Sequence, residues 1–228
     1  MNASERAPGG FWHRYAAWSL DFVAISAIAW FFTRAEMHAG LDAAIVAWEQ
    51  LFGRASQAMS DALLSGNDIH SLSQALMQDP VLQAAANAVQ DGLVQATLPF
   101  AIACAGIALL WHGLGEASSW QGSPGKHAFG LVATDVDGRR LGFARAFARQ
   151  AAGLASWVTL NLGHLLAALP PQHRALHDVI AGTRVLRADD APRMPPAAKL
   201  WLWLQVLAGI AALAWGVARY LALLAAIG

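Results

Sequence analysis

The sequence has few charged residues and one cysteine. Charged side chains make up 13% of the 228 residues, whereas a soluble domain has about 25%. The single cysteine, Cys104, excludes an intramolecular disulfide and argues against a cysteine-based metal site. Basic and acidic residues balance at 15 each, so no basic excess predicts nucleic-acid binding. With 57% hydrophobic residues and a mean hydropathy of +0.40, the composition indicates a membrane protein.

Three long apolar stretches predict membrane-spanning helices at residues 11–33, 93–112 and 200–227. As a helix, the first stretch spans about 30 Å, the thickness of the hydrocarbon core. We expect it to be retained rather than cleaved as a signal peptide, because it has Asp21 in its middle and no small-residue cleavage site after it. Arg6 and Arg14 place the N-terminus on the cytoplasmic side.

The connections differ in charge. Residues 1–10 are predicted to be a disordered cytoplasmic tail. Residues 34–92 are acidic, which suits an extracytoplasmic insert, and apolar residues at helical spacing make it amphipathic. A turn is expected at Ser65–Asp68 and a new helix at Asp79-Pro80. The apolar residues at helical spacing are Leu41, Ile45, Trp48, Leu51 and Phe52.

The second half of the chain has two basic segments, residues 113–143 and 179–199, which we place in the cytoplasm. The first contains a predicted β-hairpin over Phe129–Leu141 with its turn at Asp137-Gly138, and a short strand at 182–187 is its natural partner. Because both segments belong on one side, residues 144–178 are predicted to form a re-entrant or broken helical hairpin, interrupted near Asn161–Gly163, in preference to a single crossing.

Asp21 is the residue that this arrangement must explain. A carboxylate near the middle of a span costs at least about 2.5 kcal/mol unless it has a partner, a wet cavity or a proton. Its helical neighbours are apolar, so a partner must come from elsewhere, and Arg145, Arg149 and His164 are the candidates to approach it. A carboxylate at this depth is the kind of group that a proton or cation relay requires.

Several motifs in order resemble the RDD family of bacterial membrane proteins, over residues 11–33 and 93–188. That family is named for one arginine and two aspartates, which fall here on Arg14, Asp21 and Asp178. The resemblance implies a multi-pass protein of the bacterial cytoplasmic (inner) membrane and, at best, a transport role, with cation/proton antiport suggested for some members. The motifs are Arg14-x6-Asp21, Pro124-Gly125-Lys126, His177-Asp178 and Gly182-Thr183.

We expect the charged residues to form one cluster near the cytoplasmic mouth, with Arg14 pairing with Asp178. Two interpretations stay open. The cluster is a site for small cations or protons, in which case three spans imply a homo-oligomer. Alternatively it is a structural lock in a non-transporting adaptor or assembly protein that binds a membrane-protein partner. The candidate residues are Arg14, Asp21, Lys126, Arg174, His177, Asp178 and Thr183.

Catalytic chemistry and cofactors are not predicted. No nucleophile–base pair is visible, so we do not expect an enzyme. His173 and His177 have the i, i+4 spacing of metal ligands, but no third strong ligand adjoins them, and no metal is predicted. The sequence therefore predicts an all-α polytopic membrane protein with three full transmembrane helices, a re-entrant or broken helical hairpin and a small cytoplasmic β-hairpin.

Overall fold

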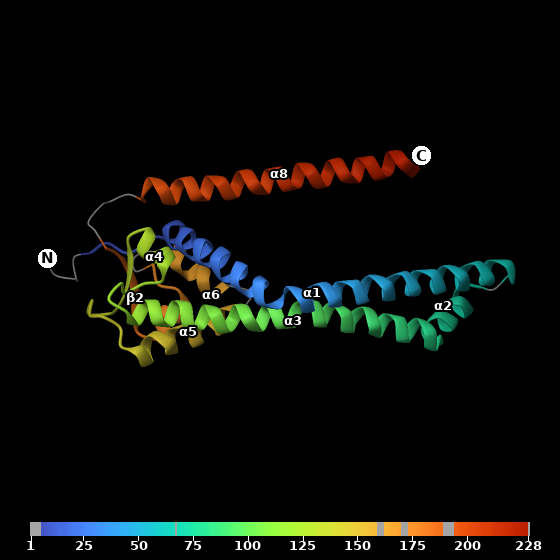
Figure 1. Cartoon of the computed structure of the whole chain (residues 1–228), viewed down its shortest axis with the longest axis horizontal. Coiled ribbons are helices and arrows are strands. Elements are labelled where there is room, and N and C mark those ends of the chain that lie inside the picture. The colour runs from blue at the N-terminus through green and yellow to red at the C-terminus, as the bar shows by residue number, and fades with distance from the viewer. Residues whose placement is uncertain (1–5, 67, 159–161, 170–172, 189–193, 228) are drawn as a thin grey trace. The chain divides into compact units, whose positions relative to one another are not determined.

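The structure is a computed structural model that describes residues 6–66, 68–158, 162–169, 173–188 and 194–227 (Figure 1). Helices dominate it, and two short strands lie between them in the chain. The elements in order are α1 (Phe11–Leu64), α2 (Ile69–Gln78), α3 (Pro80–Ala117), α4 (Pro124–Ala128), β1 (Leu131–Asp135), α5 (Phe143–Val158), α6 (Leu162–Leu165), the 3-10 turn η2 (Leu166–Ala168), α7 (Leu176–Ile180), β2 (Thr183–Arg187) and α8 (Pro196–Ile227).

Three helices of the described chain, α1, α3 and α8, are long and apolar enough to span a membrane. This confirms the predicted three spans in an all-α membrane protein with a small sheet. At 16 residues, α5 is not among them; such a helix measures about 24 Å, less than the about 30 Å of a hydrocarbon core. Whether the segment 144–178 dips into the membrane stays a prediction, and residues 159–161, which include the expected break at Asn161, lie outside the described residues.

Helix α1 is longer than the predicted span at 11–33. It continues through Arg34 and Glu36 without a break and has 54 residues. The physical reason is that Arg and Glu are good helix formers, so the end of the apolar stretch does not end the helix. The helix stops only before Gly66, whose φ of +67° lies in the left-handed region that favours glycine. Residues 34–64 are therefore a continuation of the first spanning helix rather than a separate element.

The chain divides into two compact units, described separately: residues 25–107, and residues up to 24 together with those from 108 onwards. In the first, α1 and α3 lie side by side (Figure 1). A Cβ on Gly40 would lie 2.6 Å from the carbonyl oxygen of Gly92, and one on Gly92 would lie 2.7 Å from the backbone nitrogen of Ala44. Only glycine lets the two backbones approach so closely.

The second unit is built around the two strands. β1 pairs antiparallel with β2, with Leu131 opposite Arg187 and Asp135 opposite Thr183. The predicted turn at Asp137-Gly138 is present, since Asp135 Oδ1 accepts the backbone N–H groups of Asp137 and Arg139. The return strand of the predicted hairpin is reduced to a single bridge between Thr134 and Arg140, while the Ala133 N–H of β1 donates to the Gln121 carbonyl at 2.6 Å.

The segment before α1 also joins this sheet, which corrects the predicted disorder of residues 6–10. The Gly9 N–H donates to the Val185 carbonyl at 3.0 Å, and the Arg187 N–H donates to the Ala7 carbonyl at 3.0 Å. Residues 1–5 lie outside the described residues. A cluster of buried residues joins α1, β1, β2 and α8, so the strands are fixed to the ends of two membrane helices. Its members are Ala16, Ala17, Phe129, Leu131, Val185 and Ala198.

Candidate functional site

Asp178, at the start of α7, is the centre of a buried network of charged side chains. Its Oδ2 accepts hydrogen bonds from Arg14 Nη2 at 2.5 Å and from the Ala175 N–H at 2.9 Å. Its Oδ1 accepts Nε and Nη2 of Arg149 at 3.0 and 2.8 Å. Burial alone would raise the pKa of Asp178, but the guanidinium groups of Arg149 and Arg14 hold it well below its usual range. The carboxylate is therefore ionised and fully paired.

Arg149 connects this carboxylate to a second one. Its Nη1 donates to Glu116, which lies at the end of α3 and is fully buried. Lys126 Nζ donates to the same oxygen of Glu116, and Gln150 Nε2 reaches the other oxygen at 2.8 Å. Buried ion pairs are tolerated only when the remaining hydrogen-bonding positions are filled. Glu116 meets that condition, with donors from α4 and α5.

Arg174 and Thr183 contact the backbone of Asp178 rather than its carboxylate. Arg174 donates from Nη2 to the Asp178 carbonyl at 2.9 Å and from Nε to the Thr183 carbonyl at 3.0 Å. The Thr183 hydroxyl lies 3.5 Å from the Asp178 carbonyl and donates to it. These two residues therefore hold α7 against the start of β2 and position Asp178.

His177 lies beside the network as a neutral imidazole. Its Nε2 accepts a hydrogen bond from Arg149 Nη2 at 3.1 Å, and since a guanidinium only donates, the proton of the ring is on Nδ1. Burial and the charges of Arg149 and Arg14 hold the pKa of His177 well below its ordinary value. The His164 ring lies 5.2 Å away, centroid to centroid. Neither Nδ1 atom has a hydrogen-bond partner among the described residues.

Asp21 lies apart from these ion pairs and has its own set of donors. Its Oδ1 accepts hydrogen bonds from Trp111 Nε1 at 2.8 Å and from the Gly125 N–H at 2.7 Å. Its Oδ2 accepts a hydrogen bond from the Ser123 hydroxyl at 2.6 Å. A Cβ on Gly125 would lie 2.3 Å from the Ala17 carbonyl oxygen. The motif Ser123–Lys126 is thereby explained: it presses a glycine backbone onto α1 at Asp21 and directs its lysine to Glu116.

The expected partners of Asp21 are corrected. Its donors are Trp111 on α3, and Ser123 and Gly125 in the segment that follows α3. None of its three expected partners binds it: Arg145 lies 3.4 Å from Asp135, Arg149 binds Glu116 and Asp178, and His164 lies beside His177. The physical reason for the pairing of Arg149 with Asp178 is that α5 contacts α7.

The model of the RDD family matches residues 8–182. The chain belongs to the RDD family. It is 32% identical over 91 residues to the uncharacterized protein YxaI of Bacillus subtilis, which corresponds to 40% of this chain and 60% of that protein. The chain thus spans about 60% of the length of this relative. No solved structure matches it.

Within the RDD match, the structure adds two residues to the predicted cluster. Arg149 was considered only as a partner for Asp21, and Glu116 was not among the candidate residues. The available signal was position: Glu116 follows directly after an uncharged apolar stretch, where a buried carboxylate needs a cation. The prediction included Asp21 in the cluster, whereas in the structure Asp21 lies outside the network.

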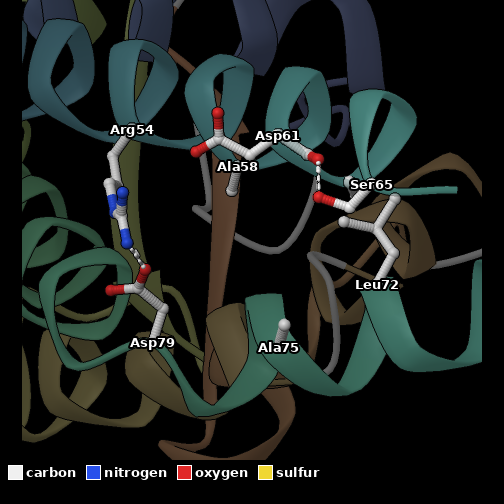
Figure 2. Close-up of a pocket in the computed structure, with 8 residues that line it drawn as sticks. Arg54, Ala58, Asp61, Ser65, Leu72, Ala75 and Asp79 are labelled. Atoms are coloured by element: carbon white, nitrogen blue, oxygen red, sulfur yellow. Dashed lines mark hydrogen bonds and ion pairs between the residues drawn. The ribbon is translucent and has the colours of Figure 1, made fainter. Parts of the chain in front are cut away.

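Across the described residues, no three His, Cys, Asp or Glu side chains are grouped as metal ligands. His173 turns its Nδ1 to the Ala167 carbonyl at 3.0 Å instead of joining His177. In residues 25–107, a small cavity of about 230 Å³ lies between α1 and α2 and is closed on one side by the ion pair of Arg54 with Asp79 (Figure 2).

Proposed function

We propose that this RDD protein is a non-transporting membrane scaffold, in which the charge network is a structural lock. By structural lock we mean that the network fixes the strands and α4, α5 and α7 to the ends of the membrane helices. The observation that carries the proposal is that the buried carboxylates are fully paired: Asp178 by Arg14 and Arg149, and Glu116 by Arg149, Lys126 and Gln150.

The number of cations supports the same function. Each of the two carboxylates of the network has two cationic donors: Arg14 and Arg149 for Asp178, and Lys126 and Arg149 for Glu116. A transport site exchanges its partners during the cycle, whereas here a migrating cation would have to displace an arginine or lysine from a buried carboxylate. Buried ion pairs add little net stability compared with apolar packing, but they favour one arrangement over others. That is the property a lock requires.

A proton- or cation-coupled transporter is the second candidate, and one observation favours it. His177 and His164 are two partly buried imidazoles next to each other, and each has a buried Nδ1 atom without a hydrogen-bond partner within the described part of the chain. Histidine is the side chain that exchanges protons near neutral pH. In this hypothesis the transporter is a homo-oligomer, because three spans per chain are too few to enclose a pathway.

For both functions we propose a bacterial inner-membrane protein with its N-terminus in the cytoplasm, because basic residues flank the first span and occupy the loops.

Ion flux in proteoliposomes distinguishes the two functions. The wild type, Asp21→Asn and His177→Gln are reconstituted under an imposed pH gradient, with Na⁺, Li⁺ or K⁺ added, and the internal pH is recorded. The scaffold proposal predicts that all three dissipate the gradient no faster than protein-free vesicles. Cation-dependent dissipation by the wild type that is lost in a folded, monodisperse Asp21→Asn or His177→Gln variant would overturn it in favour of transport.

A further inference from the structure

One face of α1 beyond the apolar stretch exposes large apolar side chains. They recur at intervals of three, four and seven residues, which puts them within about 60° of one another around the helix axis. Trp48 and Phe52 are 58% and 65% exposed. We call this row the outer stripe; it consists of Ile45, Trp48, Phe52, Met59 and Leu63.

Helix α3 covers a different face of α1. The small residues Ala44 and Ala47 are buried, and Ala44 contacts the backbone of Gly92 on α3. At about 100° per residue, Ala44 and Ala47 lie about 70° and about 130° around the helix axis from the middle of the outer stripe. The α1–α3 pairing therefore leaves the outer stripe uncovered in the described structure.

Lipid does not cover most of the stripe. The apolar stretch of α1 ends at Thr33, and Leu63 is 30 residues later, about 45 Å along a helix. On α3, the charged residue Asp91 precedes the apolar stretch, and its neighbour Gly92 packs at the level of Ala44. From Trp48 onwards the stripe therefore lies beyond the points at which both helices leave the hydrocarbon core. An exposed apolar row in water marks an interaction surface.

The charge around the stripe selects its partner. Asp42 and Glu49 flank it on the side away from α3, one heptad apart, and no basic residue accompanies them on that edge. Residues 25–107 as a whole contain seven acidic residues and two arginines, of which Arg54 already pairs with Asp79. The acidic residues are Glu36, Asp42, Glu49, Asp61, Asp68, Asp79 and Asp91.

A second copy of this chain does not complement that edge. In an antiparallel pair the acidic edges would face each other, and like charges in that position are destabilising. In a parallel pair they would face Ala44, Leu51 and Ala58, which carry no charge. A helix with lysine or arginine beside its apolar seam matches both the stripe and the edge.

We propose that the outer stripe binds an amphipathic helix of another protein, whose apolar seam is flanked by basic residues. The inference rests on the proposed function, because a scaffold needs a surface on which a partner is held. The surface is one face of α1, and the partner is a basic amphipathic helix.

Binding is measured with full-length protein in zwitterionic lipid nanodiscs and a fluorescently labelled designed helix. The helix has about three heptads, with leucine at a and d and lysine at e and g, and a second helix has glutamate at e and g. Fluorescence anisotropy reports binding, and empty nanodiscs give the lipid background. The test variant is Phe52→Gln/Met59→Gln. The control is Val46→Gln/Leu64→Gln, which removes apolar side chains that are 54% and 85% exposed and lie about 130° around α1 from the outer stripe.

We expect the lysine helix to bind the wild type and the control alike, and to bind Phe52→Gln/Met59→Gln at least about tenfold more weakly, a difference of about 1.4 kcal/mol. Asp42→Asn/Glu49→Gln should weaken binding of the lysine helix, and the difference from the wild type should shrink as the salt concentration rises. Binding unchanged in the stripe variant, tighter binding of the glutamate helix, or a stripe-dependent dimer in the nanodisc would each overturn the proposal. If the lysine helix does not bind and the proteoliposomes show no ion flux, only the proposal about the outer stripe is overturned. If the helix binds but the proteoliposomes show ion flux, the proposed scaffold function is overturned instead.

Discussion

The guanidinium of Arg149 binds Asp178 through two nitrogens, Nε and Nη2, both on the same carboxylate oxygen. The third nitrogen, Nη1, binds Glu116. One side chain on α5 thus joins a carboxylate at the end of α3 to one at the start of α7. Its side chain is only 2% exposed, so neither carboxylate can replace it with water.

Replacing Arg149 should therefore destabilise the protein strongly. Arg149→Leu leaves two buried carboxylates with fewer cations, and breaking a buried pair in this way costs about 3–5 kcal/mol. Arg145, one turn earlier on α5, is 52% exposed and pairs with Asp135, and such pairs contribute about 0–1 kcal/mol. Thermal unfolding in detergent should show a large loss for Arg149→Leu and little change for Arg145→Leu. Equal losses would show that the network is not a structural lock.

Asp21 should tolerate asparagine better than leucine. Asparagine keeps an oxygen for Trp111 Nε1 and the Gly125 N–H, and the Ser123 hydroxyl can rotate to accept from the new amide. Leucine leaves all three donors buried without an acceptor, at about 1–3 kcal/mol for each unsatisfied group. We expect Asp21→Asn to fold with a modest loss and Asp21→Leu to lose several times more, measured by the same unfolding assay. An asparagine variant as unstable as the leucine variant would mean that the negative charge itself is required.

The sequence was sufficient for features that depend on local pattern. The three apolar stretches predict α1, α3 and α8, and the pairing of residues 182–187 with the strand before Asp137-Gly138 is present as β1 and β2. The predicted contact of Arg14 with Asp178 is also present. Each of these follows from composition, turn chemistry or charge type, which the order of residues displays directly.

The contacts that depend on packing were not predictable in this way. Glu116 and Arg149 are 33 positions apart and meet because α5 packs against the end of α3, where a Cβ on Gly113 would lie 2.8 Å from the Phe147 ring. The end of α1 was placed too early, since a change from apolar to polar residues marks a membrane boundary and not a helix end. Arg145, Arg149 or His164 was expected to approach Asp21, but its carboxylate accepts hydrogen bonds from Trp111 on α3 and from Ser123 and Gly125 after it.

The close crossing of α1 and α3 gives a prediction in which one glycine substitution destabilises and another stabilises. At Gly40 an added Cβ would lie 2.4 Å from the backbone nitrogen of Ala96, so Gly40→Ala must push the helices apart, at about 1–3 kcal/mol. Gly53, on the same helix, has nothing within 4 Å of its added Cβ. Gly53→Ala should therefore stabilise by about 0.5–1 kcal/mol, because alanine is the better helix former. Unfolding temperatures that shift in the same direction would contradict the crossing.

Acid should weaken the fold through His177. Burial, with the charges of Arg149 and Arg14, holds the pKa of His177 well below its ordinary 6.5, and Asp178 only partly opposes this. Below pH 6.5 the unfolded chain therefore binds a proton at this residue that the folded chain does not, and the free energy of unfolding falls as the pH falls. Burial also lowers the pKa of His164, which adds to the effect with the same sign. The pKa of Asp178 is lowered from 3.8, so its contribution is lost only at more acidic pH.

Unfolding temperatures measured between about pH 7.5 and about pH 5.5 separate these contributions. The wild type should lose stability over this interval by up to about 1.4 kcal/mol for each histidine and pH unit below its ordinary pKa. His177→Gln removes the protonation but keeps a side chain that accepts from Arg149, so its pH dependence should be flatter. His70→Gln, at an exposed position on α2, should retain the wild-type slope. If the unfolding temperatures of His177→Gln and the wild type fall equally as the pH is lowered, protonation of His177 does not cause the loss of stability. The interaction of Arg149 with Asp178 then does not require a neutral imidazole at position 177.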